Sequence, residues 1–234
     1  MDSSVHVLVP YRDREKHLKQ FMDDFVPVLK KNIPDINITI IEQSQDNKGF
    51  NRGKLLNVGI KEECDSATHF IFHDVDTLCD DFCVKQLYRV HSHHEDIVRI
   101  CVPHSTSLGC ICKFTKESIF KINGFPNSIY GWGIEDRALY WRSKIKKVSM
   151  SVDNTHNYSF KNLPHPSNVR RYFGDTKSIS ERWKENNIKK LKDKDKNKLV
   201  DSDGLNNVDY KVLNYTHIGN GVHKMLVELD PDPS

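Results

Sequence analysis

Residues 70–79, FIFHDVDTLC, place two carboxylates directly after an apolar run. Asp74 and Asp76 are separated by one residue, so in an extended chain they point to the same side. They repel each other unless a cation lies near them, and burying either one unpaired is unfavourable. Hard divalent cations prefer carboxylate oxygens, and a site that adds a histidine favours Mn²⁺ over Mg²⁺. The stretch therefore indicates either a metal site or a solvated strand tip.

Two other stretches carry side chains suited to a nucleotide, with cationic groups for its phosphates and an aromatic ring for its base. In VPYRDRE, Arg12 and Arg14 follow a predicted strand, where two guanidinium groups can grip a diphosphate. In GFNRGKLLN, Phe50 can stack on a base, and Arg52 and Lys54 lie at a predicted helix start, where backbone N–H groups favour anions. Taken singly, each stretch is equally compatible with a helix cap and ordinary surface charges.

The stretch GWGIED combines a tryptophan with two carboxylates. Trp132 lies between two glycines and can swing onto a sugar face or a nucleotide. Glu135 and Asp136 follow at a predicted helix start, where the helix dipole favours the ionised form. An ionised carboxylate in a sugar pocket is a candidate general base for a hydroxyl. The alternative is a packed tryptophan beside an acidic helix cap.

The elements that must position these residues alternate between strands and helices. Apolar runs predict strands over 5–10, 36–43 and 68–76, and helical spacing of apolar residues predicts helices over 15–31 and 51–63. This alternation favours a parallel, doubly wound α/β sheet, in which ligands bind beyond the carboxyl ends of the strands.

The second half of the chain continues in the same α/β style. Residues 109–127 predict a strand, a helix and a Gly/Pro turn, and residues 135–144 predict another helix. From about 164 to 203 the chain is polar and lysine-rich, which is typical of a solvated loop or helix face. Residues 206–218 and 223–229 predict two closing strands that form a hairpin around GNG.

Length, charge and composition restrict the class of protein. The 234 residues suffice for one large α/β domain or two small ones. A net charge of +3 gives no argument for a nucleic acid or a membrane surface as partner. No apolar stretch approaches the roughly 18 residues that span a bilayer, and no signal peptide precedes VHVLVP. We expect a soluble, cytoplasmic protein with no nucleic-acid partner and no membrane span, or a catalytic fragment of a longer one.

The six cysteines all lie between Cys64 and Cys112. They are sparser than in small disulfide scaffolds, and their spacings do not match a structural zinc site. We expect free, partly buried thiols, with one or two disulfides or a metal site as the alternatives.

Five stretches occur in the order seen in the β-1,4-galactosyltransferase family, glycosyltransferase family 7, which the chain resembles from residue 5 to about 213. They are VPYRDRE, FNRGKLLNVG, HDVD, INGFPNSIYGWGIED and SDGLNNVDYKVL. The resemblance implies an α/β, GT-A type, Rossmann-like nucleotide-diphospho-sugar transferase fold in a single domain, 1–234. It implies a nucleotide-binding half, 1–105, and an acceptor-binding half, 106–234, with a mobile polar segment near 160–200.

The resemblance also implies roles for individual residues. Asp76 and His165 match the metal ligands, with His156 as a competitor for the second position, and Asp136 matches the catalytic base. Acceptor binding is implied for Trp132, Glu135 and Asp136, and UDP-sugar binding for Pro10, Tyr11, Arg12, Arg14, Phe50, Arg52, Asp74, Val75 and Trp132.

The implied function is that of an inverting, metal-dependent UDP-sugar hexosyltransferase. It uses Mn²⁺ or another divalent cation and moves galactose or N-acetylgalactosamine to a sugar hydroxyl of a glycan, glycoprotein or glycolipid. The alternatives are the same fold with UDP-glucose or UDP-GlcNAc as donor, or a non-catalytic sugar-nucleotide or glycan-binding module. A metal-dependent hydrolase is disfavoured, because the carboxylates and histidines of a two-metal site are not found.

Departures from the family pattern bear on the substrates and the origin. Arg137 stands where the family usually has more acidic residues, and it can pair with Asp136 or meet an acidic acceptor. SLGC (107–110) replaces an aromatic residue followed by Gly-Gly, in a pocket that helps to distinguish galactose from its N-acetyl analogue, so the donor stays open. We expect no membrane anchor of the kind that Golgi members carry, and the Lys- and Asn-rich composition suits a viral or bacterial member.

Overall fold

The structure is a computed structural model that describes residues 4–90, 95–102, 104–131, 133–152, 158–164 and 187–231. The strands are β1 (Val5–Tyr11), β2 (Asn37–Gln43), β3 (His69–His73), β4 (Thr77–Cys79), β5 (Ile97–Cys101), β6 (Ile111–Thr115), β7 (Met150–Val152), β8 (Phe160–Asn162), β9 (Tyr210–Gly219) and β10 (Val222–Leu229). The helices are α1 (Glu15–Gln20), α2 (Val26–Asn32), α3 (Arg52–Glu63), α4 (Asp81–Leu87), α5 (Lys116–Lys121), α6 (Glu135–Ile145) and α8 (Asp193–Ser202).

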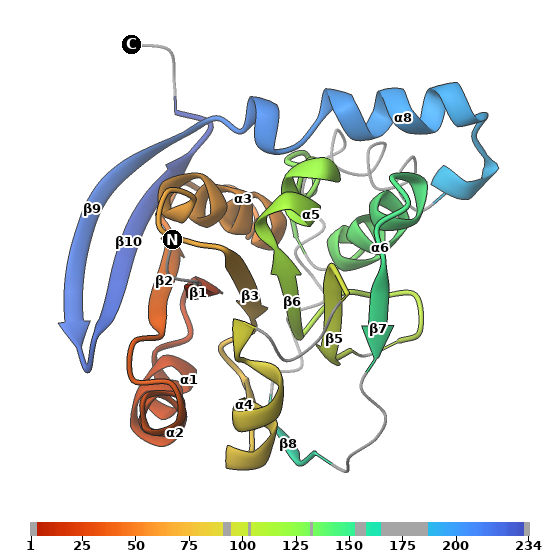
Figure 1. The fold of residues 1–234 in the computed structure, drawn as a ribbon. Coiled ribbons are helices and arrows are strands. Elements are labelled where there is room, and N and C mark those ends of the chain that lie inside the picture. Colours follow the sequence, from red (N-terminus) through yellow and green to blue (C-terminus); the bar gives the residue numbers. More distant parts are fainter. Residues whose placement is uncertain are drawn as a thin grey trace.

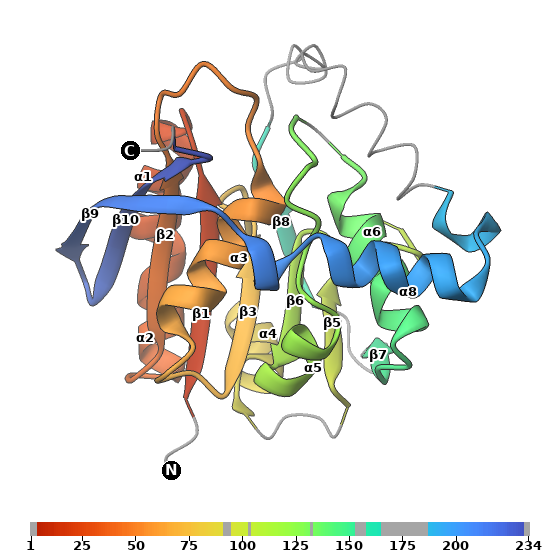
Figure 2. The same cartoon turned by 90° about the horizontal axis from the view of Figure 1, so that it is seen from above.

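Eight of these strands form one mixed sheet in the order β7-β5-β6-β3-β1-β2-β10-β9, with helices on both faces (Figure 1, Figure 2). The central strands β3, β1, β2 and β10 run parallel, as the strand–helix alternation predicts. The outer strands break the pattern, because β6 pairs antiparallel with β3 and β5, and β9 pairs antiparallel with β10. The predicted parallel arrangement is therefore confirmed for the central strands and does not extend to the outer ones. Sequence periodicity reports which face of a strand is buried but not the direction of its neighbour.

The predicted closing hairpin is present as β9 and β10. Its turn consists of Asn220 and Gly221, which have φ angles of 52° and 67°. Positive φ at both central residues is the requirement of a tight two-residue hairpin turn, which asparagine and glycine meet at little cost. The hairpin returns the chain to the sheet beside β2 and places the end of β10 near the loops that precede α3.

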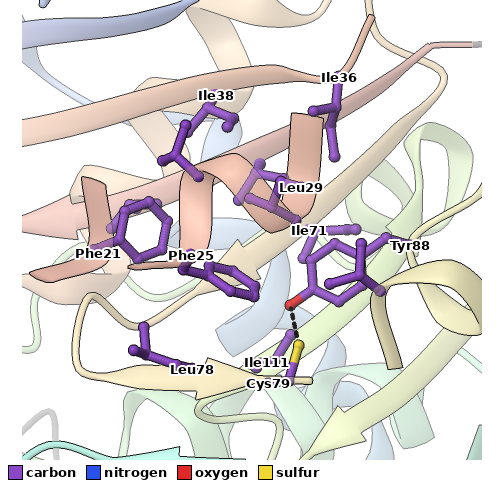
Figure 3. Close-up of a cluster of buried hydrophobic side chains, with 14 of the residues drawn as sticks. Phe21, Phe25, Leu29, Ile36, Ile38, Ile71, Leu78, Cys79, Tyr88 and Ile111 are labelled. Carbon is purple, nitrogen blue, oxygen red and sulfur yellow. Dashed lines mark hydrogen bonds between the residues drawn. The ribbon is translucent and has the colours of Figure 1, made fainter. Parts of the chain in front are cut away.

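Each central strand buries side chains on both faces, because helices cover both sides of the sheet. In β1, Val7 packs into a cluster with α2 and α4, and Leu8 packs into a second cluster with α3 and α5. Figure 3 shows the first cluster, in which Phe21, Phe25 and Leu29 turn toward the strands. The two clusters hold the sheet rigid below the ends of its strands.

The helix predicted over 15–31 is one helical segment that includes a π-helical turn at Phe21–Phe25 between α1 and α2. Pro27 follows this turn. It has no N–H, and its ring excludes a carbonyl one turn earlier, so the α-helical hydrogen-bond ladder is interrupted there. The turn brings the rings of Phe21 and Phe25 to 5.4 Å between centroids.

The helices predicted over 51–63 and 135–144 are present as α3 and α6, whereas α4 was not predicted. The side chain of Asn51 caps α3 by accepting the Lys54 N–H at 2.9 Å. The lysine-rich stretch contributes α8, a mostly exposed helix that lies across α6 (Figure 1). Within the described ranges, no helix has the length and apolar character needed to cross a bilayer.

Candidate active site

The Asp-Val-Asp segment forms a turn at the carboxyl end of β3. The strand ends at His73 and does not continue through Asp76 as predicted. The Thr77 N–H closes the turn by donating to the Asp74 carbonyl at 3.2 Å. Both aspartates are half-buried and Val75 between them is buried. They are therefore not alternate positions of one strand, and strand alternation gives no reason for them to share a cation.

Arg52 links this turn to the two carboxylates that begin α6. Its Nε donates to Asp74 Oδ1 at 2.7 Å, and its Nη1 lies 4.0 Å from Glu135 Oε1. The guanidinium carbon lies 5.9 Å from the centre of the Phe125 ring. The structure thus brings together Arg52 and Asp74, predicted to bind the donor, with Glu135, predicted to bind the acceptor.

The cluster places opposite charges in a desolvated position. Burial opposes the charge on Arg52, but the carboxylates of Asp74 and Glu135 outweigh it and raise the pKa of the guanidinium. Burial, reinforced by Asp136, raises the pKa of Glu135 to about 7 although Arg52 opposes the rise. Nη1 and Nη2 of Arg52 and Oε2 of Glu135 are buried without a hydrogen-bond partner among the described residues. Buried polar atoms are rarely left unpaired, so these atoms indicate a place for the polar groups of a ligand.

Asp136 lies beside Glu135 in the first turn of α6, at the positive end of the helix dipole. Its Oδ1 accepts the Arg137 N–H at 2.7 Å, and its Oδ2 accepts the Ser107 hydroxyl at 2.5 Å. Ile134, the residue directly before α6, has a φ of 82°. A β-branched residue rarely adopts this backbone conformation. Strain of this kind is typical of functional sites, and here it lies directly before the two carboxylates that begin α6.

The arginines that follow β1 lie beyond the carboxyl end of a central strand, as predicted. Arg12 Nη1 donates to Asp46 Oδ1 at 3.3 Å and so braces the loop after β2. Arg14 is half-buried directly before α1. Pro10 and Tyr11 are buried at the end of β1, where burial raises the pKa of the Tyr11 phenol. These residues shape the wall of the site, and their contact with a donor stays a prediction.

The loop before α3 and the loop before α6 are joined. The Gly131 N–H donates to the Phe50 carbonyl at 2.7 Å. The Tyr130 hydroxyl and the Lys54 ammonium both donate to the Asp230 carboxylate at the end of β10. Sequence reasoning missed Asp230, because nothing in the local pattern connects the last strand to these loops. Trp132 lies outside the described residues, so its role stays a prediction.

The second predicted metal ligand, His165, and its competitor His156 also lie outside the described residues. The described chain reaches Pro164, and β8 pairs antiparallel with β4. The Leu163 N–H donates to the Asp76 carbonyl at 2.7 Å, so this part of the chain runs beside the aspartate. Among the described residues, no group of three His, Cys, Asp or Glu side chains could hold a metal ion.

A network of buried polar side chains fixes the turn at residues 122–127, INGFPN. Sequence reasoning did not indicate this network. Asn57 of α3 donates to the Phe125 carbonyl at 2.8 Å and accepts the Phe125 N–H at 2.9 Å. Asp203 accepts the Asn127 N–H through its side chain at 2.8 Å, and its carbonyl accepts from Arg142 Nη1 at 2.7 Å. The family-like stretches INGFPN and SDGLNN are therefore bonded to each other.

All six cysteines are free thiols, three of them buried and three half-buried, as predicted. One contributes to the site through its backbone, because the Cys110 carbonyl accepts the Asp74 N–H at 3.0 Å. This bond joins the end of β3 to the chain that enters β6.

Two family models match consecutive parts of the chain. Residues 1–90 match the N-terminal region of glycosyl transferase group 7, and residues 90–166 match the N-terminal domain of galactosyltransferase. β-1,4-Galactosyltransferase 4 of Homo sapiens is 37% identical over 158 residues, which cover 63% of this chain and 44% of that protein. β-1,4-Galactosyltransferase 1 of Bos taurus is 30% identical over 224 residues, which cover 89% of this chain and 50% of that protein. The chain spans about half the length of these curated relatives.

Solved glycosyltransferase structures share the fold. A Drosophila β-1,4-galactosyltransferase 7, crystallised with manganese, UDP-Gal and xylobiose, has a TM-score of 0.79 at 24% identity and covers 99% of this chain and 96% of its own. The mannosyltransferase PcManGT of Pyrobaculum calidifontis, crystallised with GDP-Man and Mn²⁺, has a TM-score of 0.50 at 12% identity and covers 65% of this chain and 55% of its own. The predicted GT-A type fold is confirmed.

Proposed function

The chain belongs to glycosyl transferase group 7, the family of the β-1,4-galactosyltransferases, and we propose that it is an inverting, metal-dependent glycosyltransferase. It moves a hexose, galactose or N-acetylgalactosamine, from a UDP-sugar to a sugar hydroxyl. The observation that carries this proposal is the partly buried cluster of Arg52, Asp74 and Glu135, in which buried polar atoms of Arg52 and Glu135 make no hydrogen bond to any described residue. The cluster lies beyond the carboxyl ends of parallel strands, where this class of sheet binds ligands.

The donor side of the site is formed by residues at the ends of β1 and β3 and at the start of α3. Arg52 offers the donor two guanidinium nitrogens that make no hydrogen bond within the described part of the chain, and Arg14 adds positive charge before α1. Phe50 is half-buried and can stack on the uracil base. The UDP-Gal bound by the Drosophila relative supports this choice of ligand.

A divalent cation, Mn²⁺ by preference, binds Asp76 and His165 in this proposal. One carboxylate with one imidazole suits Mn²⁺, and manganese is present in the Drosophila relative. His165 is favoured over His156 because the chain up to Pro164 runs beside Asp76. When bound, the cation supplies charge neutralisation for the departing UDP.

Asp136 is the general base. It takes the proton of the acceptor hydroxyl as the hydroxyl oxygen bonds to the anomeric carbon and the bond from that carbon to the UDP oxygen breaks. Attack from the face opposite UDP inverts the anomeric carbon. Glu135, whose pKa is about 7, is partly protonated near neutral pH and can donate to or accept from an acceptor hydroxyl.

In this proposal each half of the chain binds one of the two substrates. Residues 1–105 hold the nucleotide, and residues 106–234 hold the acceptor, which is the end of a glycan, glycoprotein or glycolipid. Trp132 and the polar segment near 160–200 close over the donor and exclude water. The xylobiose bound by the Drosophila relative supports a sugar acceptor.

The proposal is tested by UDP release from UDP-galactose, UDP-N-acetylgalactosamine, UDP-glucose and UDP-N-acetylglucosamine, with Mn²⁺ or with EDTA. We expect release from one donor, stimulated by acceptor sugars and lost with EDTA and in Asp76→Ala. Asp136→Asn lowers the acceptor-dependent rate by about 10²- to 10⁴-fold. Asp35→Ala, an exposed aspartate before β2, serves as the matched control. UDP binding without release from any donor would instead support a non-catalytic binding module.

A further inference from the structure

Residues 107–109 form a loop that lies directly against Asp136. The Ser107 hydroxyl donates to Asp136 Oδ2 at 2.5 Å. The Leu108 N–H donates to the Asp136 carbonyl at 3.2 Å, so the backbone of the loop is fixed to the start of α6 as well. A hydroxyl that donates to a carboxylate forms a charge-assisted hydrogen bond, which is stronger than a bond between two neutral groups.

The direction of the Ser107 hydroxyl is set by a second bond. The Gly109 N–H donates to Ser107 Oγ at 3.0 Å and occupies one of the oxygen lone pairs. Ser107 is only 2% exposed, so bulk water does not compete for its proton. The hydroxyl proton is therefore directed at Asp136 Oδ2.

Gly109 leaves the space that this contact needs. A Cβ atom at this position would lie 2.9 Å from Asp136 Oδ2 and 3.3 Å from Ser107 Oγ. Any side chain at residue 109 would thus push the carboxylate away from the serine. The φ of Gly109 is not in the left-handed region, so alanine could adopt its backbone conformation.

Both carboxylate oxygens of Asp136 are held by separate donors, Ser107 on Oδ2 and the Arg137 N–H on Oδ1. Two donors fix the plane of the carboxylate as well as its position. We propose that Ser107 is a positioning residue for the general base, an inference that rests on the proposed function: its hydroxyl orients Asp136 so that a lone pair meets the acceptor hydroxyl. A base fixed in this way before substrate binds needs less reorganisation during transfer.

The test measures kcat and the two KM values for Ser107→Ala, Ser107→Thr and Gly109→Ala with the active UDP-sugar, Mn²⁺ and an acceptor sugar. We expect Ser107→Ala and Gly109→Ala to lower kcat by about tenfold, with a change of less than about twofold in the donor KM and in the dissociation constant of UDP. Ser107→Thr keeps the hydroxyl and restores at least half of the wild-type kcat. Ser105→Ala, in the same loop but exposed, is the matched control and leaves kcat unchanged.

A double variant separates positioning from a merely structural role. A residue that acts only through Asp136 has no further effect once the base is removed. We therefore expect Ser107→Ala/Asp136→Asn to transfer, with radiolabelled donor, at the same residual rate as Asp136→Asn. A further loss in the double variant, or a Ser107→Ala defect confined to the donor KM, would overturn the inference. Absence of transfer by the wild type would instead reject the proposed function, which keeps the two failures distinct.

Discussion

Replacing Glu135 by glutamine should stabilise the protein above neutral pH. Glu135 is 8% exposed, and its carboxylate lies against Asp136 and near Arg52. Burial raises its pKa from 4.5 to about 7. The folded protein thus holds this proton to higher pH than the unfolded chain does. The stability that the group contributes is fully present below pH 4.5 and is lost as the pH rises through about 7.

The size of the effect follows from this pKa difference. Each unit of pKa corresponds to about 1.4 kcal/mol, so ionised Glu135 destabilises the fold by roughly 3 kcal/mol at pH 8. Glutamine stays neutral at every pH and has nearly the same shape. We expect Glu135→Gln to be more stable than the wild type by roughly 3 kcal/mol at pH 8 and by less than about 1 kcal/mol at pH 5. For a chain of this length the gain at pH 8 raises Tm by roughly 6 to 12 °C.

The assay is urea denaturation of the wild type and the variant from pH 5 to pH 8.5, with the free energy of unfolding compared at each pH. Glu117→Gln is the matched control, because Glu117 also lies in the first turn of a helix but is exposed. Its effect on the free energy of unfolding should stay within about 0.5 kcal/mol, as is usual for an exposed substitution. A Glu135→Gln variant that is no more stable than the wild type at pH 8, or equally more stable at pH 5, would refute the argument.

Three further changes probe the polar contacts around the site. Asn57→Ala leaves the buried backbone groups of Phe125 unpaired and should reduce the free energy of unfolding, measured by urea denaturation, by about 3 kcal/mol. A reduction below about 1 kcal/mol would mean that water replaces the side-chain amide. Asp230→Asn removes the charged partner of buried Lys54 and loosens the loops before α3 and α6. The donor KM should therefore rise several-fold while kcat falls less. An unchanged donor KM would mean that Asp230 does not hold these loops for donor binding. Arg52→Lys keeps the charge but loses the guanidinium fork, so UDP binding measured by calorimetry should weaken by about tenfold; unchanged binding would place the nucleotide elsewhere.

Much of the fold could be predicted from the sequence, because periodicity reports burial. Apolar runs located β1 and β2, and the helical spacing of apolar residues located α3. The sequence could not report the end of β3 at His73, since the following Asp-Val-Asp fits an extended chain as well as a turn. What decides between them is the bond from Thr77 to the Asp74 carbonyl, which only the folded chain shows.

The candidate site was predicted in part for a similar reason. Arg52, Asp74 and Glu135 come from three separate stretches, and their residue types suggested chemistry before their proximity was known. Ser107 stood out only as part of SLGC, with no link to Asp136, and Asp230 carried no such signal, because an aspartate near a loop is common. Their contacts with Asp136 and Lys54 join residues that are 29 and 176 positions apart, which local pattern does not encode.

The most direct test of the central claim is the anomeric configuration of the transfer product. The active UDP-α-sugar is incubated with Mn²⁺ and an acceptor sugar, and the linkage is determined by proton NMR for the wild type and for Asp136→Asn. Inverting transfer with Asp136 as the base predicts a β-linked product that forms with the wild type and is nearly lost in the variant. An α-linked product, or equal yields from the two proteins, would contradict the account.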